Sequence, residues 1–154
     1  MCWSSGLQVI PWAVPALVLL GGSMALGQTV DEAEGTVTIC GQKVTPPANL
    51  PPPGSPPVFW LIVPCFEAQG GQPLVEAQTY VYYIQSLSKI SRPSQNHWTP
   101  WNERIEHGLV ADFRRLWGTN FLDNLTVDVR DYAFENGVVG KVALFHMEER
   151  HRVK

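Results

Sequence analysis

A regular alternation of apolar and polar residues marks the last third of the chain. Three apolar residues alternate with three polar ones over six positions: Leu125, Val127, Val129 and Thr126, Asp128, Arg130. A period of two is typical of a β-strand with one buried face and one wet face. A second strand is predicted from about Val138 to Glu148. Since Asn136-Gly137 supplies turn chemistry, the two strands are predicted to form a hairpin with a longer loop around residues 132–137.

A helical pattern precedes this hairpin. Between Pro100 and Trp117, apolar residues recur at spacings of four, four and three: Ile105, Leu109, Phe113 and Leu116. These positions share one face of a helix, so the segment is predicted to be amphipathic and to cover a sheet or another helix. Thr99 is the predicted N-cap and Pro100 the first helical residue. Gly118 is predicted to end the helix in the left-handed conformation.

The pattern is less decisive upstream. Residues 79–90 contain the run from Tyr80 to Ile84 and are interpreted as a first strand. A helix with Val81, Ile84, Leu87 and Ile90 on one face fits almost as well. The apolar run Val58–Phe66 is a buried strand, a docking segment or a docked element of the folded module, because periodicity cannot decide for so short a run.

Proline clusters suggest how the chain is divided. Prolines occur at 46–47, 51–53 and 56–57, and proline fixes φ and lacks an N–H. Residues 28–78 are therefore predicted to be a proline-rich, largely disordered arm before a folded domain at 79–154. Residues 1–27 have no charged side chain and contain an apolar run from Val9 to Leu20. This pattern predicts a signal peptide cleaved after Gly27, since the run is too short for a membrane anchor and contains two prolines.

Charge and cysteine content narrow the possible partners. The formal net charge is −3. Binding of nucleic acid would require a clustered basic patch, so nucleic acid is not a favoured partner. Beyond the predicted signal peptide, the cysteines are Cys40 and Cys65. In an oxidising periplasm they could form a disulfide across the proline-rich segment, or both could be small apolar residues in the arm.

The sequence contains no recognisable catalytic or metal-binding motif. The spacing of His97, His107, His146 and His151 matches no H-E-x-x-H or similar metal-ligand pattern. Glu148 and Glu149 are adjacent at a strand end and should point to opposite faces, which makes them poor partners for acid and base catalysis. No G-x-S-x-G, P-loop or dinucleotide fingerprint occurs. The protein is expected not to be an enzyme and to use no cofactor or metal.

The helix end and the hairpin carry a resemblance to a known family. The segment Phe113-Arg114-Arg115-Leu116-Trp117-Gly118-Thr119-Asn120-Phe121-Leu122-Asp123, the strand with Val127 and Val129, and the final Leu144 to Lys154 resemble a POTRA unit of the BamA-type outer-membrane protein assembly factors. The resemblance covers residues 79–154. It implies an α+β fold, a three-stranded mixed sheet covered by one or two helices. The first of the family's two helices would have to fit between Ile90 and Trp98, as a single turn or not at all, and Val153 would begin a following unit.

The resemblance also implies a function. POTRA units receive unfolded outer-membrane protein precursors and accessory assembly lipoproteins by β-strand addition, so the chain is expected to be a periplasmic scaffold for β-barrel insertion. Its outer-membrane barrel would lie outside this chain. The expected peptide-binding edge strand consists of Leu125, Thr126, Val127, Asp128, Val129, Arg130 and Asp131. The alternatives are a POTRA module of a two-partner secretion transporter and a free-standing periplasmic binding domain.

Overall fold

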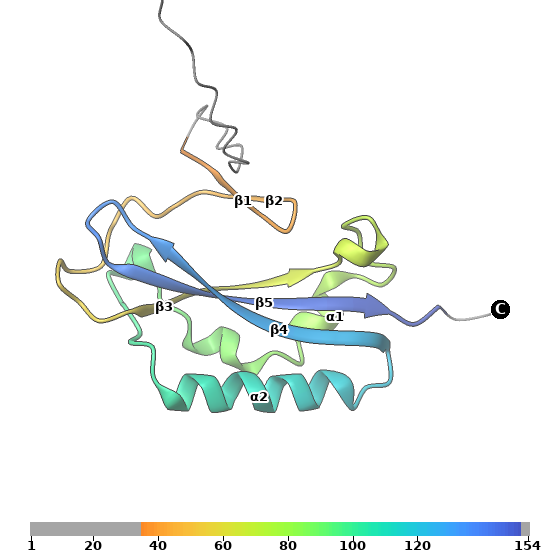
Figure 1. Cartoon of the computed structure of the whole chain (residues 1–154). Coiled ribbons are helices and arrows are strands. Elements are labelled where there is room, and N and C mark those ends of the chain that lie inside the picture. The colour runs from red at the N-terminus through yellow and green to blue at the C-terminus, as the bar shows by residue number, and fades with distance from the viewer. Residues whose placement is uncertain (1–34, 152–154) are drawn as a thin grey trace, which may run out of the picture.

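The computed structural model describes residues 35–151, which form an α+β unit built on a three-stranded mixed sheet (Figure 1). The strands are β3 (Val58–Cys65), β4 (Leu122–Ala133) and β5 (Val139–Glu149), in the order β3-β5-β4. The central strand β5 pairs parallel with β3 and antiparallel with β4. A separate antiparallel hairpin consists of β1 (Val37–Ile39) and β2 (Gln42–Val44).

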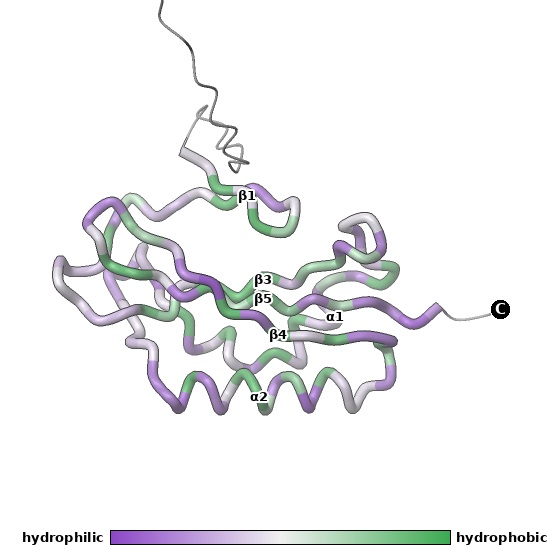
Figure 2. The backbone as a smooth tube through the Cα atoms, in the orientation of Figure 1, coloured by the Kyte–Doolittle hydropathy of each residue, from purple (hydrophilic) through white to green (hydrophobic). Residues whose placement is uncertain are grey.

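Both faces of the sheet are covered. On one face lies the long helix α2 (Glu103–Trp117), and on the other lies the hairpin β1-β2 (Figure 1). Consecutive residues Val142 to Phe145 of β5 are all buried, as expected for a central strand with apolar layers above and below it. Figure 2 shows hydrophobic residues along β3 and β5 and a banded pattern on α2, whose apolar side faces the sheet.

The two faces carry separate hydrophobic clusters. The first packs under α2 and includes Phe59, Leu109, Leu116 and Phe145. The second lies under the β1-β2 side and comprises Val58, Trp60, Val63, Cys65, Phe134, Val138, Val142 and Leu144. Ile39, Val44 and Leu50 pack against this second cluster. The β1-β2 hairpin and the proline-rich segment therefore complete the core on the side away from α2.

The helix and the hairpin predicted from the sequence are confirmed. Helix α2 buries Ile105, Leu109 and Leu116, and β4 and β5 pair in one antiparallel register. The turn lies at residues 134–138, where Gly137 has a φ of 82° and its N–H donates to the Phe134 carbonyl at 2.9 Å. Strand β4 runs to Ala133, so the loop is shorter than the predicted 132–137.

The helix boundaries differ from the prediction. The N-cap of α2 is Asn102, whose side-chain oxygen accepts the N–H of Ile105 at 3.2 Å. Thr99 is not the cap because its carbonyl accepts the N–H of Phe59 at 2.8 Å, which holds residues 99–100 against β3. Gly118 is not left-handed, with a φ of −64°. The left-handed residue is Asn120, two positions later, with a φ of 58°.

The predicted first strand at residues 79–90 is wrong. This region forms helix α1 (Ala77–Val81) and a 3-10 helix, η2 (Gln85–Lys89). Tyr80 in α1 and Ile84 just before η2 are both buried and belong to the hydrophobic cluster under α2. The alternative of one continuous helix is also only partly right, because the helical segment is interrupted between Val81 and Gln85. Between Ile90 and Trp98, where the resemblance implied a single helical turn or none, lies the short 3-10 helix η3 (Pro93–Gln95).

The strand that completes the sheet lies inside the range predicted to be a disordered arm. The apolar run at residues 58–66 supplies β3, in which six hydrophobic residues are buried, and Phe66 just after the strand is buried as well. The folded unit therefore begins before residue 79. The proline-rich segment is packed as well, since the side-chain amide of Asn136 donates to the carbonyl of the buried Pro51 at 2.6 Å. A further 3-10 helix, η1 (Glu67–Gln69), follows β3. The predicted signal peptide at 1–27 lies outside the described residues.

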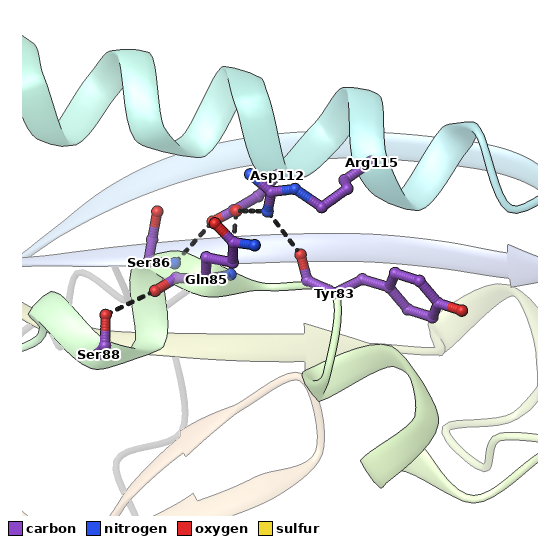
Figure 3. A network of polar contacts seen from close by, with 6 residues as sticks. All are labelled: Tyr83, Gln85, Ser86, Ser88, Asp112 and Arg115. Carbon is purple, nitrogen blue, oxygen red and sulfur yellow. Dashed lines mark hydrogen bonds and ion pairs between the residues drawn. The ribbon is translucent and has the colours of Figure 1, made fainter.

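A buried carboxylate ties the segment before α2 to the helix. Asp112, with 1% of its surface exposed, accepts the backbone N–H groups of Gln85 and Ser86, both at 3.0 Å. Arg115 pairs with Asp112 and also donates to the Tyr83 carbonyl at 2.9 Å (Figure 3). This network fixes α2 against residues 83–86, and α2 in turn forms one wall of the candidate site below.

Replacing Asp112 is expected to weaken this attachment. Asp112→Asn keeps one acceptor oxygen but loses the charge that strengthens the bonds, so we expect the free energy of unfolding to fall by about 2 kcal/mol in chemical denaturation. Asp128→Asn is the matched control, because Asp128 forms an exposed pair with Arg130, and such pairs contribute about 0–1 kcal/mol. Equal losses in the two variants would contradict the role assigned to the network.

Candidate functional site: the free edge of β4 and its groove

The seven residues predicted to form a peptide-binding edge all lie in one strand at the edge of the sheet. Leu125–Asp131 are part of β4, which pairs with β5 on one side only. Leu125 and Val127 point to the α2 side and join the cluster beneath the helix. Asp128 and Arg130 form an exposed ion pair at 3.0 Å. Binding of a peptide by these residues stays a prediction.

The outer side of β4 has no backbone partner within residues 35–151. In the part of the chain that the structure describes, every backbone hydrogen bond of this strand goes to β5 or remains within the hairpin. An edge strand of this kind presents unpaired N–H and C=O groups in a row, which is a template for another extended chain. The strand is twelve residues long, so the template is long enough for a peptide of several residues.

The opposite edge of the sheet, at β3, is partly occupied. The N–H of Phe59 donates to the Thr99 carbonyl and the N–H of Ser91 donates to the Phe59 carbonyl, both at 2.8 Å. At the other end of the strand, the Gln42 side chain donates to the Pro64 carbonyl at 3.0 Å, and Pro64 has no N–H to offer. Among the two edges, β4 is therefore the one available for strand addition.

An apolar groove runs beside the free edge, between β4 and α2. Its volume is about 540 Å³, and it is lined by Trp101, Glu106, Leu109, Val110, Phe113, Val127, Val129 and Lys141. Val110 on the helix is 49% exposed and Val129 on the strand is 38% exposed, although both are large and apolar. A strand added to β4 would place every second side chain over this groove, because side chains alternate between the faces of a sheet.

The polar groups of the groove already have partners in the chain. Lys141 Nζ lies 2.6 Å from Asp131 Oδ1 across the β4-β5 pair. Trp101 Nε1 donates to Glu106 Oε1 at 2.9 Å. The open contact surface is therefore mainly the apolar one formed by Val110, Phe113 and Val129. This arrangement suits an apolar side chain better than an ionic ligand.

Sequence reasoning missed the helical wall of this site. Val110 lies next to Leu109 but outside the spacing that defines the buried face, so the sequence places an apolar side chain on the solvent side of α2. This exposed apolar position is the feature of the sequence that could have indicated a binding surface on the helix. The sequence does not show that Trp101 and Lys141 lie beside Val110, because only the packing of α2 against the sheet brings these residues to one groove.

A second buried carboxylate lies away from the groove, at the end of β5. Glu149 is 2% exposed and accepts hydrogen bonds from the Tyr80 hydroxyl, the Gln69 amide and the N–H groups of Leu74 and Val75. Burial by itself would raise the pKa of Glu149, but the hydrogen bonds from Tyr80, Leu74, Gln69 and Val75 outweigh it and hold the pKa below its usual value. Its neighbour Glu148 is exposed on the opposite face, as predicted. The carboxylate therefore serves to anchor the loop at residues 69–75.

The structure also brings together residues that the sequence left apart. Cys40 and Cys65 form a disulfide with a Cα–Cα distance of 5.5 Å, which decides between the two alternatives for these cysteines. His146 lies beside them, and its Nδ1 is 3.4 Å from Glu67 Oε2. Among the described residues, the other histidines join no group of potential metal ligands.

Comparisons with protein-family models, curated proteins and solved structures give no match to this chain. Within residues 35–151, no helix is both long enough and apolar enough to cross a membrane.

Proposed function

We propose that this chain is a POTRA-type scaffold module of an outer-membrane β-barrel assembly factor, and that it binds unfolded precursor strands along β4. The observation that carries the proposal is the combination of an unpaired edge strand and an adjoining apolar groove. The order β3, helices, β4, β5 and the mixed sheet are compatible with the fold that the sequence resemblance implies. Export to the periplasm and contact with assembly lipoproteins are parts of the same proposal.

The binding mode follows from the chemistry of the two surfaces. Backbone groups of β4 would pair with any extended peptide and so provide affinity with little dependence on sequence. The groove would select peptides in which apolar side chains alternate with polar ones. Strands of outer-membrane barrels have that alternation because one side faces lipid and the other faces the barrel interior. The module would therefore prefer such strands to peptides of the same composition in a different order.

The direct test is binding of a ten-residue barrel-strand peptide to isotope-labelled protein, followed by NMR. We expect chemical-shift changes at residues 125–131 and at Val110 and Phe113. Val110→Asp places a charge in the apolar groove, and we expect it to weaken binding at least ten-fold, or about 1.4 kcal/mol. Since Val110 is half-exposed, the substitution should leave the fold intact.

Two controls make the result interpretable. Ala111→Asp adds the same charge one position along α2, at an exposed residue outside the groove, and should bind like the wild type. A scrambled peptide without alternation should bind more weakly to all three proteins. Equal binding by Val110→Asp and Ala111→Asp, or shift changes confined to the β3 side of the sheet, would overturn the proposal.

A further inference from the structure

A cluster of metal-ligating side chains lies on the face of the sheet opposite the α2 groove. Cys40 lies in the turn between β1 and β2, Cys65 is the last residue of β3, and His146 is its partner across the β3-β5 pairing. The sulfur atoms and a ring nitrogen of His146 all lie within 4.8 Å of one another. The three residues come from three separate parts of the sequence, so their meeting is a property of the fold.

We propose that this cluster is a zinc site in the reduced protein. A dithiol reductant transfers two electrons and two protons to the Cys40–Cys65 disulfide and becomes a disulfide itself, which leaves two thiols on the chain. Zn²⁺ then binds the two sulfurs as thiolates, releasing two protons, and takes the neutral imidazole of His146 as its third ligand. In the oxidised protein the sulfurs are bonded to each other and the site does not bind the ion.

The ligand set and its spacing suit zinc. Zn²⁺ prefers thiolate and imidazole ligands, at about 2.3 Å from sulfur and about 2.0–2.1 Å from nitrogen in a tetrahedral arrangement. In that geometry two sulfurs stand about 3.8 Å apart, so they must separate once the disulfide is cleaved. Cys40 can allow this, because it belongs to the turn of a two-stranded hairpin rather than to the central sheet.

The surroundings of the cluster favour an ion that can enter from solvent. Cys65 is 1% exposed, whereas Cys40 is half-buried and the His146 side chain is 26% exposed. Three protein ligands leave a fourth position for water. The Glu67 carboxylate, 3.4 Å from His146 Nδ1, would orient the ring, as carboxylates beside zinc-bound histidines commonly do.

The site has a structural consequence. In the oxidised protein the disulfide joins the β1-β2 hairpin to the end of β3, over the second hydrophobic cluster. In the reduced protein zinc would make the same connection through Cys40, Cys65 and His146. The covering of this face would then be kept in both redox states, and it would be lost only when the protein is reduced and free of metal.

The test uses the full chain in a Cys2→Ser background, so that Cys40 and Cys65 are the only thiols. The protein is reduced with a dithiol, freed of reductant without oxygen, and titrated with Zn²⁺ against a chromophoric chelator. We expect one ion per chain, and we expect Zn²⁺ to restore the thermal midpoint that reduction lowers. Co²⁺ in place of zinc should give the thiolate-to-cobalt absorption of a tetrahedral site.

The variants separate a built site from binding by the thiols alone. His146→Ala should bind Zn²⁺ at least ten-fold more weakly, and Glu67→Gln should lose about ten-fold through its effect on His146. His107→Ala, on the exposed side of α2, should bind like the parent. The oxidised form of each variant, with its disulfide intact, reports whether the fold is preserved. Unchanged affinity in both His146→Ala and Glu67→Gln, or equal binding by oxidised and reduced protein, would overturn the proposal.

Discussion

Removing the Cys40–Cys65 disulfide, as in Cys40→Ala/Cys65→Ala, is expected to lower the free energy of unfolding by about 3.5 kcal/mol. The disulfide closes a loop with a sequence separation of 25 residues, and the loss follows from the extra conformational freedom of the unfolded chain. Denaturant unfolding without added metal would measure it. Cys2→Ser, which removes the remaining cysteine, is the control and should leave stability unchanged.

The loss should also be localised within the molecule. The disulfide holds the β1-β2 hairpin, and this hairpin and the segment after it cover the second hydrophobic cluster. Amide hydrogen exchange in the double variant should therefore increase most in residues 37–44, with smaller changes in α2 beyond those that follow from global unfolding. Exchange that rises uniformly over both faces, or a stability loss below about 1 kcal/mol, would show that the disulfide is not what holds the hairpin in place.

Neutralising Glu149 is the second substitution with a large expected effect. Glu149→Gln should lower the free energy of unfolding at pH 7 by about 2–3 kcal/mol, because a buried charged acceptor of several hydrogen bonds becomes a neutral amide. Its new NH₂ group would also face donors where the carboxylate accepted bonds. Glu148→Gln is the matched control, since Glu148 is the exposed neighbour on the opposite face. It should change stability by less than about 0.5 kcal/mol.

The effect of Glu149 should depend on pH in a defined direction. Hydrogen bonds hold the folded pKa of Glu149 below the ordinary value of 4.5, against the upward effect of burial. A carboxyl group with a lowered pKa stabilises the fold above its unfolded pKa, and that stability is lost as the pH falls through the folded pKa. The difference between wild type and Glu149→Gln should therefore be full at neutral pH and shrink below about pH 4.5. A constant difference from pH 7 to pH 3 would contradict this account.

The two buried carboxylates, Asp112 and Glu149, stabilise the fold in the same way. Each accepts backbone N–H groups from a segment that lies before α2 in the sequence: residues 85–86 for Asp112 and residues 74–75 for Glu149. The irregular region between β3 and α2 is thereby fixed at two points. The groove beside β4 keeps its helical wall because α2 is held on the side away from that groove.

The sequence alone determined the elements whose patterns are visible locally. Ile105, Leu109 and Leu116 recur with the helical period and become the buried face of α2. The alternation from Leu125 to Arg130 and the Asn136-Gly137 turn predict the β4-β5 hairpin, which the structure contains. Both predictions succeed because one face of each element is buried and the other is exposed to solvent. This contrast gives a regular period of apolar and polar residues in the sequence.

The third strand could not be settled in the same way. Residues 58–65 are apolar on both faces because β3 lies between α2 and the hydrophobic cluster under β1-β2, so they show no alternation. The segment around Tyr80 to Ile84 is rich in residues that favour strands, yet β3 already occupies the available side of β5. Here the pairing of distant segments overrides local preference.

For the candidate sites, the sequence supplied the strand and the tertiary structure supplied everything that surrounds it. The residues of β4 follow from the alternation, but the free edge depends on the order β3-β5-β4, and the groove depends on the packing of α2. Cys40 and His146, the most distant pair of the zinc ligands, are 106 positions apart in the sequence. No local pattern can signal such a cluster, because only the parallel pairing of β3 with β5 and the docking of the β1-β2 hairpin bring its atoms within reach of one ion.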